Sequence, residues 1–390
     1  VASALGPVLG GLFGRDQWPW LFYINLPICT VPLVTILVVM KMKTGRADTS
    51  SLTSFRKLGQ LDVLGNVIFV PSMISLLFGL VTGAIQYPWS SFRVILPLVV
   101  GVVGWVGFHV QQHFVANPMV PKRLFSNRTS AASYTLSFLI SIVAQAALYF
   151  VPVYLQAIVG AIVLVTGVDF LPTALGILVA AAVAGVILSK TGAYKPLHWV
   201  AFALGSLGFG LFTLLDTNTQ TVAWVFYQLF AASGSGIPTS TLLPAIMAAL
   251  PESDVAAATS IFSFIKTFGY IWGVTVPSVI FNAVFNQKLH RIEDDSIRGL
   301  LKDGGAYAYA SHFHTNRDSL SPAVRREVAS AYVTSLKAIW WLGIALSILG
   351  FLVVFIEKSL ELRTELRTEF GLDEQTKEPR STQDETGDGL

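Results

Sequence analysis

The sequence predicts an all-α integral membrane protein, and three observations lead to this fold class. Hydrophobic residues make up 53% of the 390 residues and charged residues only 13%, against roughly 25% charged in an ordinary soluble domain. Apolar runs repeatedly reach the ~20 residues that a helix needs to cross a bilayer. The basic residues lie between these runs rather than on one face, so nucleic acid is not an expected partner.

The apolar runs predict ten membrane spans, the first of them partial. They lie near residues 1–13, 20–40, 62–85, 93–113, 131–153, 163–188, 195–215, 222–249, 256–283 and 333–356. A very apolar soluble protein does not fit this pattern, because soluble helices seldom reach such a length ten times in one chain. The sequence therefore predicts a bundle of helices within the bilayer.

The basic residues of the short loops predict the side of the membrane that each loop faces, since such residues are retained in the cytoplasm. Lys and Arg gather in the loops 41–61 and 114–130, and Lys190 and Lys195 occupy the turn after residue 188. The loops between them carry fewer basic residues. We therefore expect these three loops and the tail after residue 357 to be cytoplasmic, and the long loop 284–332 to lie outside.

Three residues predict where two helices begin. Ser321 is a good N-cap and Pro322 suits the first helical position, so a helix should start there and run into the last span. Asp62 stands at the start of the 62–85 span, where a carboxylate favours the positive end of the helix dipole. We assign these residues a structural role.

Motifs of enzyme chemistry do not occur in the sequence. There is no Gly-rich phosphate loop followed by Lys-Ser or Lys-Thr, which argues against ATP-driven export by this chain. His109 and His113 are spaced i, i+4, as metal ligands can be, but no acidic or cysteine ligand lies near them, so we expect histidines of the membrane interface. Cys29 is the only cysteine and can form no internal disulfide. We expect no catalytic residue and no metal site.

Polar side chains inside the apolar runs are the candidates for function, because such groups are costly in lipid and usually face a cavity or a partner. Gln145 and Tyr149 share a helical face of the 131–153 span. Tyr227 and Gln228 lie one turn from Trp224 in the 222–249 span. These four residues are our candidates for a substrate path. The alternative for Gln145 is a hydrogen bond that only bridges two helices.

Two of the charged residues within the predicted spans have a candidate role or an expected position. Asp169 begins a span beside Pro172 and is the candidate for proton coupling; the alternative is a solvated acid at a helix start. Lys266 lies on the inner third of the 256–283 span. For Lys266 we expect the side chain to extend its amine to the inner headgroups, as long basic side chains do near membrane interfaces.

The first residues carry a motif of small residues and an aromatic segment. The motif is Gly6-Pro7-Val8-Leu9-Gly10-Gly11, and the segment is Trp18-Pro19-Trp20-Leu21-Phe22-Tyr23-Ile24-Asn25-Leu26-Pro27. Glycines allow helix backbones to touch, and proline bends a helix. Together they resemble the antiporter motif and the following helix of the fourteen-span drug:proton antiporters of the major facilitator superfamily. The resemblance places Val1 inside the fifth span, so we expect a fragment that lacks four helices.

A second motif lies in the turn between two later spans. The run from Gly185 to Lys195 reads Gly-Val-Ile-Leu-Ser-Lys-Thr-Gly-Ala-Tyr-Lys and resembles the cytoplasmic loop motif of the superfamily, in which glycines permit a tight turn and basic residues help to gate conformations. Gly185, Lys190, Gly192 and Lys195 are the residues that match. The run departs from the pattern at Ser189, where the superfamily favours Asp, and at Ala193, where it favours a basic residue.

The strongest resemblance comes later in the chain and points to one branch of the superfamily. Its segments are Gly234-Ser235-Gly236, Leu243-Pro244, Leu250-Pro251-Glu252-Ser253-Asp254-Val255-Ala256, the run from Phe268 to Asn282, and the repeated Glu-Leu-Arg-Thr at 361–368. They are similar to fungal efflux pumps for toxins and other secondary metabolites, such as aflatoxin efflux pumps. Gly269 and Gly273 form a small-residue face at i, i+4 that allows close helix packing.

The resemblance implies a division of the chain. It gives the end of an N-terminal six-helix bundle (1–41), a cytoplasmic loop (42–61), two inserted spans (62–113), a cytoplasmic linker (114–130), a C-terminal six-helix bundle (131–356) with the outer loop 284–332, and a cytoplasmic tail (357–390). The composition of the tail predicts disorder after about residue 372.

The resemblance also implies a function: proton-coupled efflux of small amphipathic organic molecules, such as a fungal secondary metabolite or toxin, by alternating access. No cofactor is implied beyond the proton gradient. The implied partners are the lipid bilayer and the small organic substrate, for a monomer in the plasma membrane or, alternatively, in a vacuolar or vesicle membrane. Two other functions stay open, namely proton-coupled uptake of a siderophore or nutrient, and a receptor or scaffold that does not transport.

Overall fold

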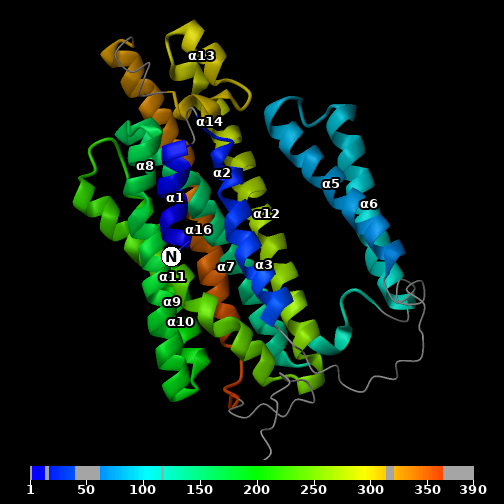
Figure 1. The fold of residues 1–390 in the computed structure, drawn as a ribbon. Helices are drawn as coiled ribbons and strands as arrows, with labels where there is room; N and C mark the ends of the chain where they lie inside the picture. The colour runs from blue at the N-terminus through cyan, green and yellow to red at the C-terminus, as the bar shows by residue number, and fades with distance from the viewer. Residues whose placement is uncertain (1, 14–16, 40–61, 116–117, 313–319, 363–390) are drawn as a thin grey trace, which may run out of the picture.

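The fold is built from helices throughout the part of the chain that the structure describes. The computed structural model describes residues 2–13, 17–39, 62–115, 118–312 and 320–362, and every regular element there is helical (Figure 1). The predicted all-α fold class is confirmed. The predicted loop 42–61 and the tail from residue 363 lie outside the described residues.

The longer helices account for most of the described chain. They are α1 (Ala2–Phe13), α3 (Asn25–Val39), α5 (Val63–Ile85), α6 (Phe92–Phe114), α7 (Arg128–Tyr154), α9 (Leu171–Thr191), α10 (Tyr194–Phe212), α11 (Thr221–Ala248), α12 (Val255–Lys288) and α16 (Pro322–Val354). Short helical turns connect them: α2 (Trp20–Tyr23), η1 (Lys122–Phe125), η2 (Leu155–Val159), α8 (Val163–Asp169), η3 (Glu252–Asp254), η4 (Leu289–Arg291), α13 (Asp295–Leu301) and α14 (Gly305–Ala310).

Several of these helices are long and apolar enough to cross a membrane, which makes the chain a multi-pass membrane protein. Within the described ranges there are seven such segments: Trp20–Val38, Val63–Gly83, Phe92–Phe114, Arg128–Val159, Val163–Thr191, Glu252–Arg291 and Pro322–Val354. Of the other predicted spans, α1 is only 12 residues long. The helices α10 and α11 are 19 and 28 residues long but are not among the seven segments.

The helices from α7 to α16 pack into one bundle around small residues. α11 packs against α9, α10 and α7, while α12 packs on α7, and α16 packs on α10 and α7. A Cβ on Gly234 would lie 2.5 Å from the backbone nitrogen of Gly205, and one on Gly208 would lie 2.4 Å from the nitrogen of Ala231. Both contacts join α10 to α11, in the way that small residues bring membrane helices together.

Glu357 anchors the end of α16 to two other helices. Its Oε1 accepts a hydrogen bond of 2.7 Å from the Ser133 hydroxyl of α7, and its Oε2 lies 2.8 Å from Nδ1 of His198 of α10. The side chains of His198 and Glu357 are fully buried. The Lys195 ammonium donates to the carbonyl oxygen of Glu357. These contacts fix the relative positions of α7, α10 and the segment after α16.

The helices α5 and α6 form a hairpin that stands to one side of the bundle (Figure 1). Asp62 caps α5 by accepting a hydrogen bond of 2.7 Å from the Gly65 N–H, which confirms its predicted place at a helix start. The same carboxylate also accepts hydrogen bonds from the side-chain amides of Gln111, at 2.8 Å, and Gln112. Asp62 therefore ties the start of α5 to the end of α6, and aromatic contacts with α12 hold the hairpin to the bundle.

Candidate functional site

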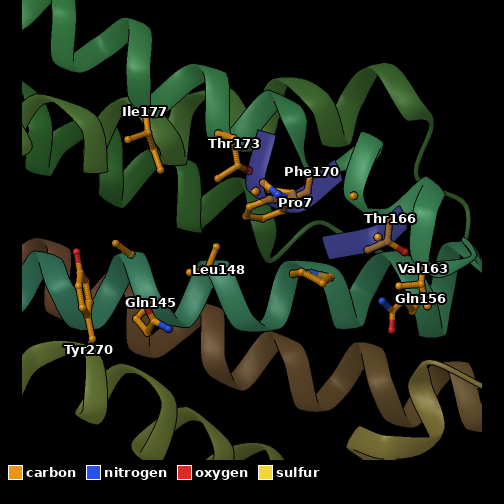
Figure 2. Close-up of a pocket in the computed structure, with 16 residues that line it drawn as sticks. Pro7, Gln145, Leu148, Gln156, Val163, Thr166, Phe170, Thr173, Ile177 and Tyr270 are labelled. Atoms are coloured by element: carbon orange, nitrogen blue, oxygen red, sulfur yellow. The ribbon is translucent and has the colours of Figure 1, made fainter. Parts of the chain in front are cut away.

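A cavity of about 700 Å³ lies between α1, α7, α8, α9 and α12. Cavities of roughly 300–1,000 Å³ suit drug-sized organic molecules. Figure 2 shows Pro7 and Phe170 on one side of it, across from Gln145 and Leu148 of α7. The residues that line it are mostly apolar: Gly6, Pro7, Gly11, Ala144, Gln145, Leu148, Pro152, Gln156, Val163, Thr166, Gly167, Phe170, Thr173, Ala174, Ile177 and Tyr270.

One wall is shaped by the last turns of α7, which depart from a regular α-helix. Pro152 lies in the final α-turn, where it removes a backbone donor, and residues Leu155–Val159 form a π-helical turn. Gly160 then adopts a φ of 80°, a conformation that favours glycine, and the chain returns as α8. Because of the π turn, Gln156 reaches the cavity (Figure 2), and such turns are frequent at functional sites.

A second wall is formed where α1 touches α8 at two glycines. A Cβ on Gly11 would lie 2.9 Å from the carbonyl oxygen of Val163, and a Cβ on Gly167 would lie 2.3 Å from the carbonyl oxygen of Pro7. Any larger residue would push the two helices apart. By contrast, a Cβ on Gly10 would meet no atom within 4 Å. Of the glycines in the antiporter-like motif, Gly11 therefore contacts α8, whereas the Cβ position of Gly10 contacts no described residue of a neighbouring helix.

Polar side chains on several walls offer hydrogen-bonding groups to a ligand. Gln145, Gln156 and Tyr270 line the cavity and form no hydrogen bond with another described residue. The hydroxyl of Thr166 donates to its own helix at 3.0 Å, and that of Thr173 donates to an amide oxygen of α11 at 2.7 Å. The two threonines can therefore accept hydrogen bonds, whereas the two amides and the phenol can both donate and accept.

The four substrate-path candidates fall in different places. Gln145 lines the cavity. Tyr149, one turn later on α7, is 38% exposed and stacks on Tyr307 of α14, with ring centroids 5.5 Å apart. Tyr227 packs against the main apolar core of the bundle. The structure thus separates Gln145 from Tyr149, although the two residues share a helical face.

Gln228 and Asp169 lie behind the cavity wall at the junction of α8 and α9. Gln228 is only 1% exposed; its Oε1 accepts the Thr173 hydrogen bond, and its Nε2 donates to the carbonyl oxygen of Asp169 at 3.1 Å. Asp169 ends α8, is half-buried, and precedes the cavity residue Phe170. Its carboxylate forms no hydrogen bond with another described residue. Gln228 therefore supports the wall rather than lining it.

The small-residue face of α12 lies directly on α7. A Cβ on Gly269 would lie 2.7 Å from the Cβ of Ser141, and one on Gly273 would lie 2.6 Å from the carbonyl oxygen of Ile142. The residue one turn from Ser141 along α7 is Gln145, whose Cβ would be 2.7 Å from the same Gly273 position. The α7–α12 seam therefore runs along one edge of the cavity.

The residues of the cytoplasmic loop motif lie away from the cavity. Gly192 ends α9 with a φ of 66°, in the left-handed region, as a tight turn requires. Lys190 is exposed, and Lys195 donates to the carbonyl oxygen of Glu357. A Cβ on Gly185 would meet Ser240 only at ordinary contact distance, 3.8 Å. This motif shapes a turn and helps to dock the end of α16.

Sequence reasoning missed the wall formed by Thr166, Gly167, Phe170 and Thr173. Two signals could have found it. Thr166 and Thr173 are seven residues apart, which places them on one side of a helix two turns apart. In addition, Pro172 stands at the start of α9, where it marks the break between α8 and α9 that brings both threonines to the cavity.

Comparison with known proteins points to one family. The sequence profile of the Major Facilitator Superfamily matches residues 1–274. A solved structure of a bacterial homolog to the human lysosomal transporter Spinster covers 73% of this chain and 66% of its own, with a TM-score of 0.44 and 12% identity.

Curated relatives are similar over almost the whole chain. The MFS-type transporter gkaD of Penicillium citrinum is 40% identical over 98% of this chain and 65% of its own length. The MFS efflux transporter aclA of Aspergillus oryzae is 40% identical over 95% and 66%, and the efflux pump FUS6 of Gibberella fujikuroi is 38% identical over 99% and 70%. The chain thus spans about two thirds of the length of these relatives. On this match of profile and sequence, the chain belongs to the Major Facilitator Superfamily.

Proposed function

We propose that the protein is a proton-coupled efflux transporter for small amphipathic organic molecules of the secondary-metabolite type. The observation that carries this proposal is the cavity of about 700 Å³ among spanning helices. Its lining residues include no charged side chain, and the amides of Gln145 and Gln156 and the phenol of Tyr270 are free to bond a ligand. Such walls suit cargo with a large apolar area and a few hydrogen-bonding groups.

The relatives support the direction of transport. Two of them are named as efflux proteins, aclA of Aspergillus oryzae and FUS6 of Gibberella fujikuroi. In transporters of this architecture, substrate sites lie near the bilayer midplane between helix bundles that rock against each other. The contact of α1 with α8 forms part of the cavity wall, so rocking of one bundle would open and close it.

Asp169 is the residue we propose for proton coupling. It is an acid within a spanning segment, it is half-buried, and it adjoins the cavity residue Phe170. Its carboxylate has no hydrogen-bond partner among the described residues. An intramembrane carboxylate without such a partner can take up and release a proton as its exposure changes.

The test is transport by the complete protein in proteoliposomes, with the neutral dye Nile red and the anionic pyrenebutyric acid as amphipathic probes. An acidic lumen should drive probe into the vesicles by antiport, whereas an acidic exterior would do so for uptake by symport. A receptor or scaffold would move neither probe under either gradient. Accumulation that requires an acidic exterior would contradict the proposed function. A lack of accumulation under both gradients would contradict it as well.

Two substitutions test the assigned residues. Gln145→Leu should raise the KM for both probes, because it removes a free amide from the cavity wall, while Gln287→Leu, an exposed amide at the end of α12, should leave transport unchanged. Asp169→Asn should abolish accumulation driven by the pH gradient but keep probe exchange at equal pH. Unchanged transport in Gln145→Leu, or gradient-driven accumulation in Asp169→Asn, would remove that residue from the mechanism.

A further inference from the structure

Lys266 carries a positive charge inside a spanning helix. Its side chain does not line the cavity, so the proposed function assigns it no role. It lies on α12 within the segment Glu252–Arg291 and is half-buried. Four residues later comes Tyr270, which lines the cavity, so the two side chains lie one turn apart on the same face of the helix. The distance between these positions along the helix axis is about 6 Å.

The surroundings of Lys266 are a niche of about 20 Å³ between α7, α11 and α12. The hydroxyl groups of Ser137, Ser141 and Thr239 line it, but each donates its proton to a carbonyl oxygen of its own helix, at 2.8, 2.7 and 3.2 Å. Their oxygen atoms are weak partners for a cation because they carry no charge. The niche therefore offers polar contacts without a counter-ion.

The ammonium of Lys266 makes no hydrogen bond and no ion pair with another described residue. Its Nζ lies 5.9 Å from the centroid of the Phe262 ring. A cation in a spanning helix is costly unless it finds a partner, and such residues therefore mark substrate or ion pathways. Lys266 thus lines a niche between three helices, and the extension of its amine toward the headgroups stays a prediction.

The niche and the cavity follow one another along the α7–α12 seam. On α7, Ser141 lines the niche and Gln145 lines the cavity one turn later; on α12, Lys266 lines the niche and Tyr270 lines the cavity one turn later. Between them the helices touch at Gly269, whose Cβ position is 2.7 Å from the Cβ of Ser141. The backbone position of Lys266 therefore lies one helical turn along α12 from the cavity residue Tyr270.

We propose that Lys266 is a specificity-determining residue that binds a carboxylate of the cargo, so that the transported molecules are amphipathic organic acids. This inference rests on the proposed function and names its substrate class. The apolar walls and free amides of the cavity hold the body of the molecule, while the ammonium supplies the charge that these walls lack. A charge-assisted hydrogen bond in such a site is about twice as strong as a neutral one.

The test is equilibrium binding to the complete protein in nanodiscs, with pyrenebutyric acid and its methyl ester as a matched pair. Lys266→Met should weaken binding of the acid about tenfold and leave the ester unchanged, while Lys266→Arg should keep the affinity for the acid, since arginine preserves the charge. Lys337→Met, a half-buried lysine on α16, is the matched control and should change neither affinity. The ester reports on folding in each sample.

Three results would overturn the assignment: acid and ester affinities that fall equally in Lys266→Met, an acid affinity that does not change, and a wild-type protein that does not bind the acid. The first would result if Lys266 pairs with an acidic residue of the protein instead of the cargo. Because binding requires no flux, acid binding without gradient-driven transport would refute the proposed function and leave this inference standing.

Discussion

The buried contact between His198 and Glu357 allows a prediction of how firmly α16 is docked. Both side chains are fully buried, with Nδ1 and Oε2 2.8 Å apart, and Ser133 donates to the other carboxylate oxygen at 2.7 Å. Removing the carboxylate by Glu357→Ala leaves two polar partners unpaired. We expect this substitution to destabilise the folded protein by about 3–5 kcal/mol, as for a broken buried ion pair.

The size of the effect distinguishes an ion pair from a neutral hydrogen bond. Hydrogen bonds between membrane helices contribute about 0.6 kcal/mol on average and about 1.7 kcal/mol at most. Glu357→Gln retains an oxygen that can accept from Ser133, so it should cost less, about 1–3 kcal/mol. For the pair formed by Glu357 and His198, we expect a coupling energy of about 2 kcal/mol, above the neutral range.

The assay is a double-mutant cycle of Glu357→Ala and His198→Ala, with the free energy of unfolding measured by titration of the purified protein with sodium dodecyl sulfate. Glu361→Ala is the control, since this acid is exposed and its loss should change stability by no more than about 0.5 kcal/mol. A coupling energy of about 1.7 kcal/mol or less, which a neutral hydrogen bond can supply, would refute the ion pair.

Three further predictions concern helix contacts. Gly167→Ala should lower the melting temperature and the transport rate, because its Cβ would lie 2.3 Å from the carbonyl oxygen of Pro7. Asp62→Ala should destabilise the start of α5 by about 1 kcal/mol through loss of the N-cap, seen as faster hydrogen exchange at the amide of Gly65. Gln228→Leu should lower the unfolding free energy by about 1–3 kcal/mol, measured by the same detergent titration, since it leaves a buried hydroxyl unpaired.

These predictions have matched controls. Gly10→Ala places a Cβ where no atom lies within 4 Å, so it should leave the melting temperature unchanged; an equal fall in both glycine variants would refute the role of contact at Gly167. In a protein that already carries Thr173→Val, Gln228→Leu should lower the unfolding free energy much less than in the wild type. The reason is that the two side chains share one hydrogen bond. Additive losses would show that the bond does not stabilise the junction.

The Asp62 cap should also depend on pH. Burial raises the pKa of Asp62, but the hydrogen bonds from Gly65 and from the amides of Gln112 and Gln111 outweigh it, so the pKa is lowered overall. A carboxylate with a lowered pKa stabilises the fold above its ordinary pKa, and that contribution is lost as the pH falls through the lowered value. The Gly65 amide should therefore exchange faster in acid in the wild type, and Asp62→Ala should remove this dependence.

The sequence by itself determined the helical membrane fold and several local features of it. Runs of about 20 apolar residues permit no other ordered structure in lipid, because every backbone polar group must be bonded within its own segment. Local signals were equally clear: Ser321 caps α16 by accepting from the Val324 N–H at 3.3 Å, and Gly192 ends α9 in the left-handed region. Each depends on residues close in sequence.

Only the tertiary structure decided which polar groups reach the cavity. Helical periodicity places Gln145 and Tyr149 on one face, yet Gln145 meets the cavity while Tyr149 stacks on Tyr307 of a distant turn. Gln228 has the same side-chain amide as Gln145, but its oxygen accepts a hydrogen bond from Thr173. The helical periodicity of the sequence shows which side chains share a face of one helix. Which other helix packs against that face depends on contacts between segments that are far apart in the chain.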